Sequence, residues 1–164
     1  MEPLRVLVVD DSLITVKKLA GMLATLGHKV AMTAATGKEA LSAYKSCNPD
    51  LVTMDITMPD MDGIEATREI RKLFPAARII MVTSHGQEAM VLDALKAGAR
   101  GYVIKPFEKD KLEAAIRNAM KLSVRQDKLQ EVIEKKASAQ DEPAQEPAES
   151  AAEPNESAQD GETP

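Results

Sequence analysis

Cysteine and histidine are scarce in this sequence, and their scarcity excludes several kinds of site. The 164 residues include one cysteine, Cys47, and two histidines. A single cysteine cannot form an intramolecular disulfide, and no cysteines and histidines cluster at the spacing of a zinc site. This cysteine usage fits a protein from a reducing compartment, so we expect a cytoplasmic location.

Long apolar segments are missing as well. The N-terminus has no basic region followed by an apolar run, and no window approaches the roughly 18 consecutive apolar residues of a membrane-spanning helix. We therefore expect neither a signal peptide nor insertion into a membrane.

Residues 137–164 lack basic and large apolar side chains. They contain eight acidic residues and four prolines, and no Lys, Arg, Ile, Leu, Val, Met or aromatic residue. Such a segment cannot bury enough apolar area to offset its ordering entropy, so we predict a disordered acidic tail. Because the chain has 21 basic and 26 acidic residues, residues 1–136 keep 21 basic against 18 acidic residues, a net charge of +3. The overall charge of −5 therefore belongs to the tail and identifies no partner of the folded part.

Short apolar runs alternate with amphipathic segments in the rest of the chain. The predicted strands are Arg5–Val9, Lys29–Ala34, Leu51–Met54, Arg78–Val82 and Gly101–Ile104. The predicted helices begin at the Ser12 N-cap, at Thr36, at Ile64, at Gln87 and near Glu108. This alternation of five strands and five helices is typical of a doubly wound α/β fold, with a parallel sheet and right-handed crossovers.

The last helix could extend beyond the sheet. Apolar residues keep an approximate helical rhythm from Leu112 to Ile133. We favour a packed helix that frays after about Leu122 over a coiled-coil dimer seam. The expected organisation is a domain over 1–122, a possible extension of the last helix over 123–136, and the tail over 137–164.

Polar residues follow four of the predicted strands at their carboxyl ends. They are Asp10 and Asp11 after the first strand, Asp55 after the third, Thr83 after the fourth and Lys105 after the fifth. In open α/β sheets, ligands bind at this edge, near the point where the strand order reverses. Each residue alone could be a cap or a surface charge, but their placement on one edge favours a common site.

Three aspartates in one place indicate a cation. Their charges would repel and raise each pKa unless a cation intervenes. Oxygen donors without histidine or cysteine select a hard ion, and Mg²⁺ needs few carboxylates. A cation flanked by Lys105 and Thr83 could stabilise a phosphoryl group, and carboxylates such as Asp55 do form aspartyl-phosphates.

Together, these motifs resemble the receiver domain of response regulators in two-component signalling. The matching segments are VVDDS, MDITMPDMDG, the Thr83–Ser84 strand end and GYVIKPF, and the resemblance covers Leu4 to about Met120. It implies a flavodoxin-like (βα)5 receiver fold with strand order 2-1-3-4-5, for which a chemotaxis receiver is itself a standard example.

The resemblance also implies which residues carry the chemistry. A histidine kinase is expected to phosphorylate Asp55 in the presence of Mg²⁺. The implied metal ligands are Asp10, Asp11, Asp55 and the backbone carbonyl of Thr57.

Further roles follow from the same resemblance. Thr83 and Lys105 are expected to contact the phosphoryl group, and Tyr102 to change rotamer on activation. The Lys105–Pro106 bond is often cis in this family. Thr57 and His85 occupy positions that tune how fast the phosphate is hydrolysed.

Two longer stretches, VTMDITMPDMDGIEA and HGQEAMVLDALKAGARGYVIKPF, resemble the single-domain chemotaxis regulators of the CheY type. The phosphorylated form of those regulators docks on the flagellar switch. The resemblance therefore favours chemotaxis, with an output face on the fourth helix, the fifth strand and the fifth helix. Met90, Val91 and Leu95 in that helix could equally be ordinary core residues.

Other functions remain open or are disfavoured. A phosphorelay intermediate, or a regulator of another output such as pili, would use the same chemistry. A haloacid-dehalogenase-type phosphatase also forms an aspartyl-phosphate, but it needs an Asp two residues after the nucleophile, where this chain has Thr57. Direct DNA binding is disfavoured because no helix-turn-helix fits after Met120 and an acidic tail repels phosphate backbones. We therefore expect that the protein is not an enzyme and that it catalyses only its own phosphorylation and dephosphorylation.

Overall fold

One parallel five-stranded sheet forms the centre of the molecule. The computed structural model describes residues 1–84, 86 and 88–139. The strands are β1 (Arg5–Val9), β2 (Lys29–Ala34), β3 (Leu51–Met54), β4 (Ile79–Thr83) and β5 (Gly101–Ile104). Their order in the sheet is β2-β1-β3-β4-β5, and every neighbouring pair is parallel. The predicted doubly wound fold and its strand order are confirmed.

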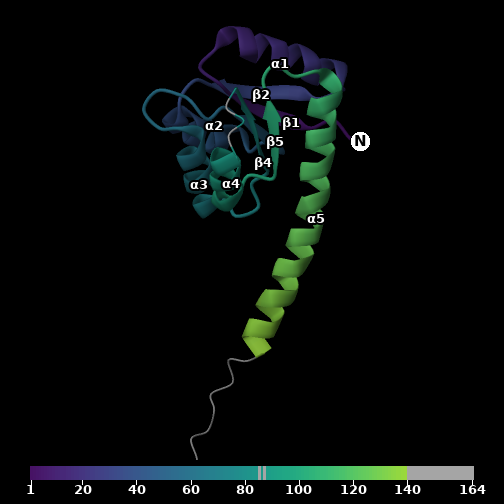
Figure 1. Cartoon of the computed structure of the whole chain (residues 1–164). Coiled ribbons are helices and arrows are strands. Elements are labelled where there is room, and N and C mark those ends of the chain that lie inside the picture. Colours follow the sequence, from purple (N-terminus) through teal and green to yellow (C-terminus); the bar gives the residue numbers. More distant parts are fainter. Residues whose placement is uncertain (85, 87, 140–164) are drawn as a thin grey trace, which may run out of the picture.

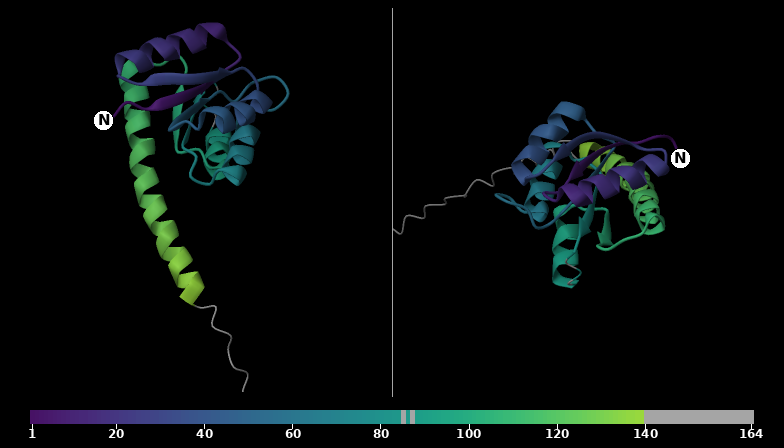
Figure 2. Two further views of the ribbon diagram at one scale, coloured as in Figure 1. Left: turned by 180° about the vertical axis from the view of Figure 1, so that it is seen from behind. Right: turned by 90° about the horizontal axis from the view of Figure 1, so that it is seen from above.

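Helices cover both faces of this sheet. They are α1 (Leu13–Thr25), α2 (Gly37–Cys47), α3 (Gly63–Leu73), α4 (Glu88–Ala97) and α5 (Lys109–Ala139). Figures 1 and 2 show α1 and α5 on one side of the sheet and α2, α3 and α4 on the other.

Each strand contributes side chains to the cores on both faces of the sheet, because successive side chains point to opposite faces. In β1, Val6 and Val8 pack in the cluster with α1 and α5, whereas Leu7 and Val9 pack in the cluster with α2, α3 and α4. A strand segment buried on both faces favours apolar residues at every position, which is why VLVV follows the exposed Arg5 as an unbroken apolar run.

Side-chain caps begin three helices directly after the loops that leave the sheet. Ser12 accepts a hydrogen bond from the Thr15 N–H at the start of α1, and Asp62 accepts one from the Glu65 N–H at the start of α3. Thr36 does the same for α2. These caps satisfy N–H groups that the first helical turn leaves without a partner, so they fix where each loop ends.

Strand β4 lies one residue later than predicted. The sequence predicted Arg78–Val82, but the strand is Ile79–Thr83, because its last residue, Thr83, pairs with Ile104 of β5. Thr83 is therefore the fully buried last residue of the strand, not the residue that follows it.

Helix α5 is continuous to Ala139, which differs from the fraying after about Leu122 that the sequence analysis favoured. Residues 123–139 contain neither glycine nor proline, so nothing in them breaks a helix. Among the helices of the described residues, none combines the length and apolarity needed to cross a membrane. His85, Gln87 and residues 140–164, which include most of the predicted tail, lie outside the described residues.

Candidate functional site

Three carboxylates meet at the carboxyl ends of β1 and β3. Asp10 and Asp11 follow β1 and Asp55 follows β3, and the two strands are hydrogen-bonded neighbours. One carboxylate oxygen from each of the three residues lies within 4.8 Å of the others. Asp10 and Asp55 are buried, with 3% and 6% of their surface exposed, whereas Asp11 is exposed. The predicted meeting of these acids is thus present in the structure.

Lys105 brings a positive charge to the acids from the end of β5. Its Nζ lies 2.8 Å from Asp10 Oδ2 and 3.6 Å from Asp55 Oδ1. The Lys105 backbone N–H donates to the Thr83 carbonyl at 2.8 Å, and the Lys105–Pro106 bond is cis, as the resemblance implied. The shorter ion pair is with Asp10, so one ammonium is shared unequally between two buried carboxylates.

The pKa of Asp55 is raised even though the Lys105 ammonium lies beside it. Burial is the largest effect that raises its pKa, and the Asp10 carboxylate raises it further. The Lys105 ammonium and the Ile56 backbone N–H act in the opposite direction without cancelling these effects. Removing a carboxylate from water disfavours its charged form, and a nearby like charge does the same. The site therefore has excess negative charge that a cation would offset.

The donors present suit a magnesium ion. All three are carboxylates, and Mg²⁺ binds oxygen ligands while keeping several waters. The exposed Asp11 leaves one side of the group accessible to solvent. The residues of the site thus fit the ion that the sequence predicted.

The other predicted site residues lie on three separate elements. Thr83 ends β4, fully buried, next to β3 in the sheet. Tyr102 lies half-buried in β5, where burial raises its pKa. Thr57 is exposed in the loop two residues after Asp55. Direct contacts of these three residues with a phosphoryl group or a metal remain predictions.

Gly63 is a residue whose importance the sequence analysis missed. It is the first residue of α3, and a Cβ built on it would lie 1.9 Å from the Asp55 carbonyl oxygen. Its N–H donates to the Ile56 carbonyl at 2.8 Å. The loop after Asp55 therefore closes on the Asp55 backbone itself. In the sequence, the sign of this close contact was a glycine at the start of a predicted helix, which is a weak signal.

A cavity of about 370 Å³ adjoins the site between α1 and the loop after β5. Lys105 and Phe107 line it from the loop, and Ile14 and Lys18 line it from α1. Ile14 is 81% exposed. Lys105 can thus be approached from outside through a partly apolar opening.

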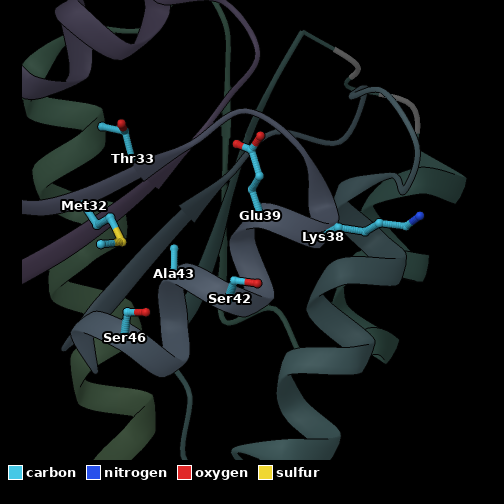
Figure 3. A pocket seen from close by; sticks show the side chains of 7 residues that line it. All are labelled: Met32, Thr33, Lys38, Glu39, Ser42, Ala43 and Ser46. Atoms are coloured by element: carbon cyan, nitrogen blue, oxygen red, sulfur yellow. The ribbon is translucent and has the colours of Figure 1, made fainter.

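Another cavity, of about 390 Å³, is unrelated to the acids. Its lining comes from β2 and α2, as Figure 3 shows, and includes Thr33, Lys38 and Ser42. It contains none of Asp10, Asp11, Asp55 and Lys105. We therefore place the functional site at the acids.

Comparison with known proteins agrees with the fold and shows the family. The model of the response regulator receiver domain matches residues 6–117. The chain belongs to this family, and its receiver domain is similar to those of CheY proteins.

Particular relatives and structures share most of this domain. The chain is 44% identical to the chemotaxis protein CheY of Thermotoga maritima over 117 residues, which are 71% of this chain and 98% of the relative. It is also 44% identical to CheY of Bacillus subtilis over 116 residues, 71% of this chain and 97% of the relative. A chain in the crystal structure of the CheX–CheY–BeF₃–Mg²⁺ complex from Borrelia burgdorferi matches with a TM-score of 0.68 at 41% identity, covering 70% of this chain and 87% of that chain.

Proposed function

We propose that the protein is a phosphoacceptor response regulator that a histidine kinase phosphorylates on Asp55. The observation that carries this proposal is the shared ion pair, in which Lys105 Nζ lies 2.8 Å from Asp10 and 3.6 Å from Asp55. With Asp11 alongside, the buried Asp55 carboxylate lies beside an ammonium and two further carboxylates that could hold a metal, which supports its role as the acceptor. These are the parts that phosphoryl transfer to a carboxylate needs.

The transfer itself is a displacement at phosphorus. An Asp55 carboxylate oxygen attacks the phosphohistidine of the kinase, a P–O bond forms, and the P–N bond breaks. The histidine nitrogen leaves and takes up a proton. The new group on Asp55 carries a charge of about −1.5 to −2 with three acceptor oxygens. Lys105 then pairs with one oxygen, and the Thr83 hydroxyl donates a hydrogen bond to another.

Asp10, Asp11, Asp55 and the Thr57 backbone carbonyl would hold Mg²⁺ in this reaction. When bound, the ion neutralises charge on the phosphoryl oxygens. The relative from Borrelia burgdorferi supports this assignment, because its structure contains Mg²⁺ together with BeF₃. The chain's own contribution is to hold the three carboxylates at one sheet edge with Lys105 facing them.

Phosphorylation would act on an output face made of α4, β5 and α5. Movement of Thr83 towards the phosphoryl group lets Tyr102 turn and reshape this face. Leu92, Leu95 and Ile104 are exposed there, which suits a protein partner. A switch from mostly off to mostly on needs about 5.5 kcal/mol. A few charge-assisted hydrogen bonds of roughly 1.5–3 kcal/mol each supply much of it.

The output we propose is chemotaxis, with the flagellar switch as the downstream target and the cytoplasm as the place of action. The similarity to CheY of two bacteria supports this choice. In our proposal residues 1–122 form the receiver, the extension of its last helix runs to Ala139 and does not end at residue 136 as the sequence predicted, and the acidic residues that follow form a tail. The protein acts on no substrate other than itself.

The test is phosphorylation of the full chain by a small phosphodonor such as acetyl phosphate. We expect the wild type to gain one phosphoryl group with Mg²⁺ and none with a chelator, as measured by intact mass. Asp55→Ala should gain none, because the acceptor is gone. The control is Asp93→Ala, an exposed aspartate of α4, which should behave like the wild type.

Retained phosphorylation of Asp55→Ala would refute the assignment of the acceptor. The output is tested separately, by binding of a flagellar switch protein with and without BeF₃. If BeF₃ leaves that binding unchanged while phosphorylation still occurs, chemotaxis is the wrong output and the phosphoacceptor assignment stands.

A further inference from the structure

The connection between β2 and α2 contacts both loops that supply the acids. The Asp10 N–H donates to the carbonyl of Ala34, the last residue of β2, at 3.0 Å. Three residues later, Gly37 lies against Met61 of the loop between β3 and α3. Residues 34–37 contain no acidic side chain. They nevertheless contact the backbone of the loop after β1, which carries Asp10 and Asp11, and of the loop after β3, which follows Asp55.

Gly37 is needed for close contact and not for its backbone angles. A Cβ built on it would lie 2.6 Å from Met61 Cβ, 2.7 Å from the Met61 carbonyl oxygen and 2.9 Å from Met61 Cγ. Real Cβ atoms do not approach other atoms so closely. The glycines with positive φ among the described residues are Gly27 and Gly98, so an alanine at position 37 would suit the helix.

The β3–α3 loop is the partner that would have to move. The start of α2 is fixed by reciprocal hydrogen bonds, from the Glu39 N–H to Thr36 Oγ1 at 3.1 Å and from the Ala35 N–H to Glu39 Oε2 at 2.9 Å. On the loop side, the Met61 N–H donates to the Pro59 carbonyl at 2.9 Å, and Asp60 is exposed and has a φ of 68°. That hydrogen bond lies within the loop and does not tie Met61 to the rest of the fold, so we expect added volume at Gly37 to displace the loop and leave the helix in place.

We propose that Gly37 is a positioning residue for the cation site. Because it has no side chain, Met61 can lie against the first turn of α2, and this contact holds the loop that runs from Asp55 through Thr57. The inference rests on the proposed function, since it concerns the same cation. It assigns to α2, which provides no ligand, the task of holding the Thr57 carbonyl near the carboxylates.

The experiment compares Mg²⁺ affinity of full-length variants by calorimetry. Gly37→Ala should bind Mg²⁺ about tenfold more weakly, the range for loss of groups that orient metal ligands. The matched control is Gly21→Ala, the same change inside α1 with nothing within 4 Å of the new Cβ, and its affinity should be unchanged. Amide hydrogen exchange without metal should be faster in residues 56–62 of Gly37→Ala alone.

Met61→Gly provides a second route to the same contact if Gly37→Ala does not fold, because it removes the Met61 Cβ and Cγ that lie against position 37. It should also weaken Mg²⁺ binding, because the loop loses its contact with α2. The double variant should bind about as weakly as the weaker single variant, since both substitutions break one contact. Additive losses would overturn the inference.

The two proposals fail in distinguishable ways. If the wild type binds Mg²⁺ and is phosphorylated on Asp55, but Gly37→Ala keeps the wild-type affinity, the role of Gly37 is refuted and the proposed function stands. If the wild type itself does not bind Mg²⁺, both are refuted.

Discussion

The decisive residue is Asp55, a carboxylate held where its charge is costly. It is buried, it faces Asp10, and it shares Lys105 with that residue. Added positive charge would stabilise a carboxylate in this state, and the fold holds it there against its electrostatic cost. If Asp55 is the acceptor that we propose, function and stability oppose each other at this position.

This opposition leads to a prediction for Asp55→Asn. In metal-free buffer near neutral pH, the variant should be more stable than the wild type by on the order of 1 kcal/mol. The substitution removes a buried charge whose pKa is raised, and Lys105 keeps Asp10 as its partner. Urea unfolding with a chelator present measures the difference.

The control for this prediction is Asp93→Asn, which removes an exposed charge of α4 and should change the free energy of unfolding by less than about 0.5 kcal/mol. Saturating Mg²⁺ should stabilise the wild type more than Asp55→Asn, because binding to the folded state adds to its stability. A destabilised Asp55→Asn in chelator would contradict our account of the charge.

At the scale of elements, α5 combines two different segments in one helix. Its first part carries Leu112, Ile116 and Ala119, all fully buried against the sheet on the side of α1. Its later part runs past the sheet, as Figure 1 shows, and Val132 there is 48% exposed. Packing therefore stabilises the first part of the helix, whereas helix propensity sustains the rest.

Substitution in the packed part of α5 should show this division. Ile116→Ala should lower the free energy of unfolding by about 2–5 kcal/mol, because it leaves a cavity in a closed core. Asn118→Ala, two residues later on the exposed side, should change it by less than about 0.5 kcal/mol. Denaturant unfolding measures both, and equal effects of the two substitutions would contradict the packing described here.

At the scale of the whole molecule, the two ends of the sheet carry different ionisable groups. The carboxyl ends of the strands hold the acids, and the amino ends hold His28. This histidine is 7% exposed, and its Nδ1 accepts a hydrogen bond from the Leu4 N–H at 3.2 Å. It lines a cavity with Glu113 and Ile116 of α5. His28 thus joins the start of β1, the start of β2 and the last helix.

Folding stability should depend on pH through this histidine. Burial, and to a lesser extent the N-terminal ammonium, lowers the His28 pKa from its ordinary value of 6.5. As the pH falls below 6.5, the unfolded chain binds a proton before the folded protein does, so the free energy of unfolding falls. Urea unfolding at about pH 7.5 and about pH 5.5 measures this loss.

The matched variant is His28→Asn, which offers an acceptor in a similar place but does not titrate. Its free energy of unfolding should fall less between the two pH values than that of the wild type. Every other titratable group is the same in the two proteins, so its contribution cancels from the comparison. Parallel pH profiles for the two proteins would rule out His28 as the source.

The sequence by itself determined the elements, their order and the group of acids. Local patterns carry this information: apolar runs such as VLVV (residues 6–9) specify buried strands, and an acid directly after such a run lies at the carboxyl end of a strand. Since all five strands are parallel, their carboxyl ends share one edge, so Asp10, Asp55 and Lys105 were predicted to meet.

Only the tertiary structure decided how those residues meet. The unequal sharing of Lys105 between Asp10 and Asp55, the closure of the loop by Gly63 and the contact of Gly37 with Met61 depend on distances between segments far apart in the chain. The sequence does not show which atoms will lie against a given glycine in the folded protein. The physical reason is that close packing depends on how the helices and the sheet assemble, whereas strand and helix patterns depend on residues that are near one another in the sequence.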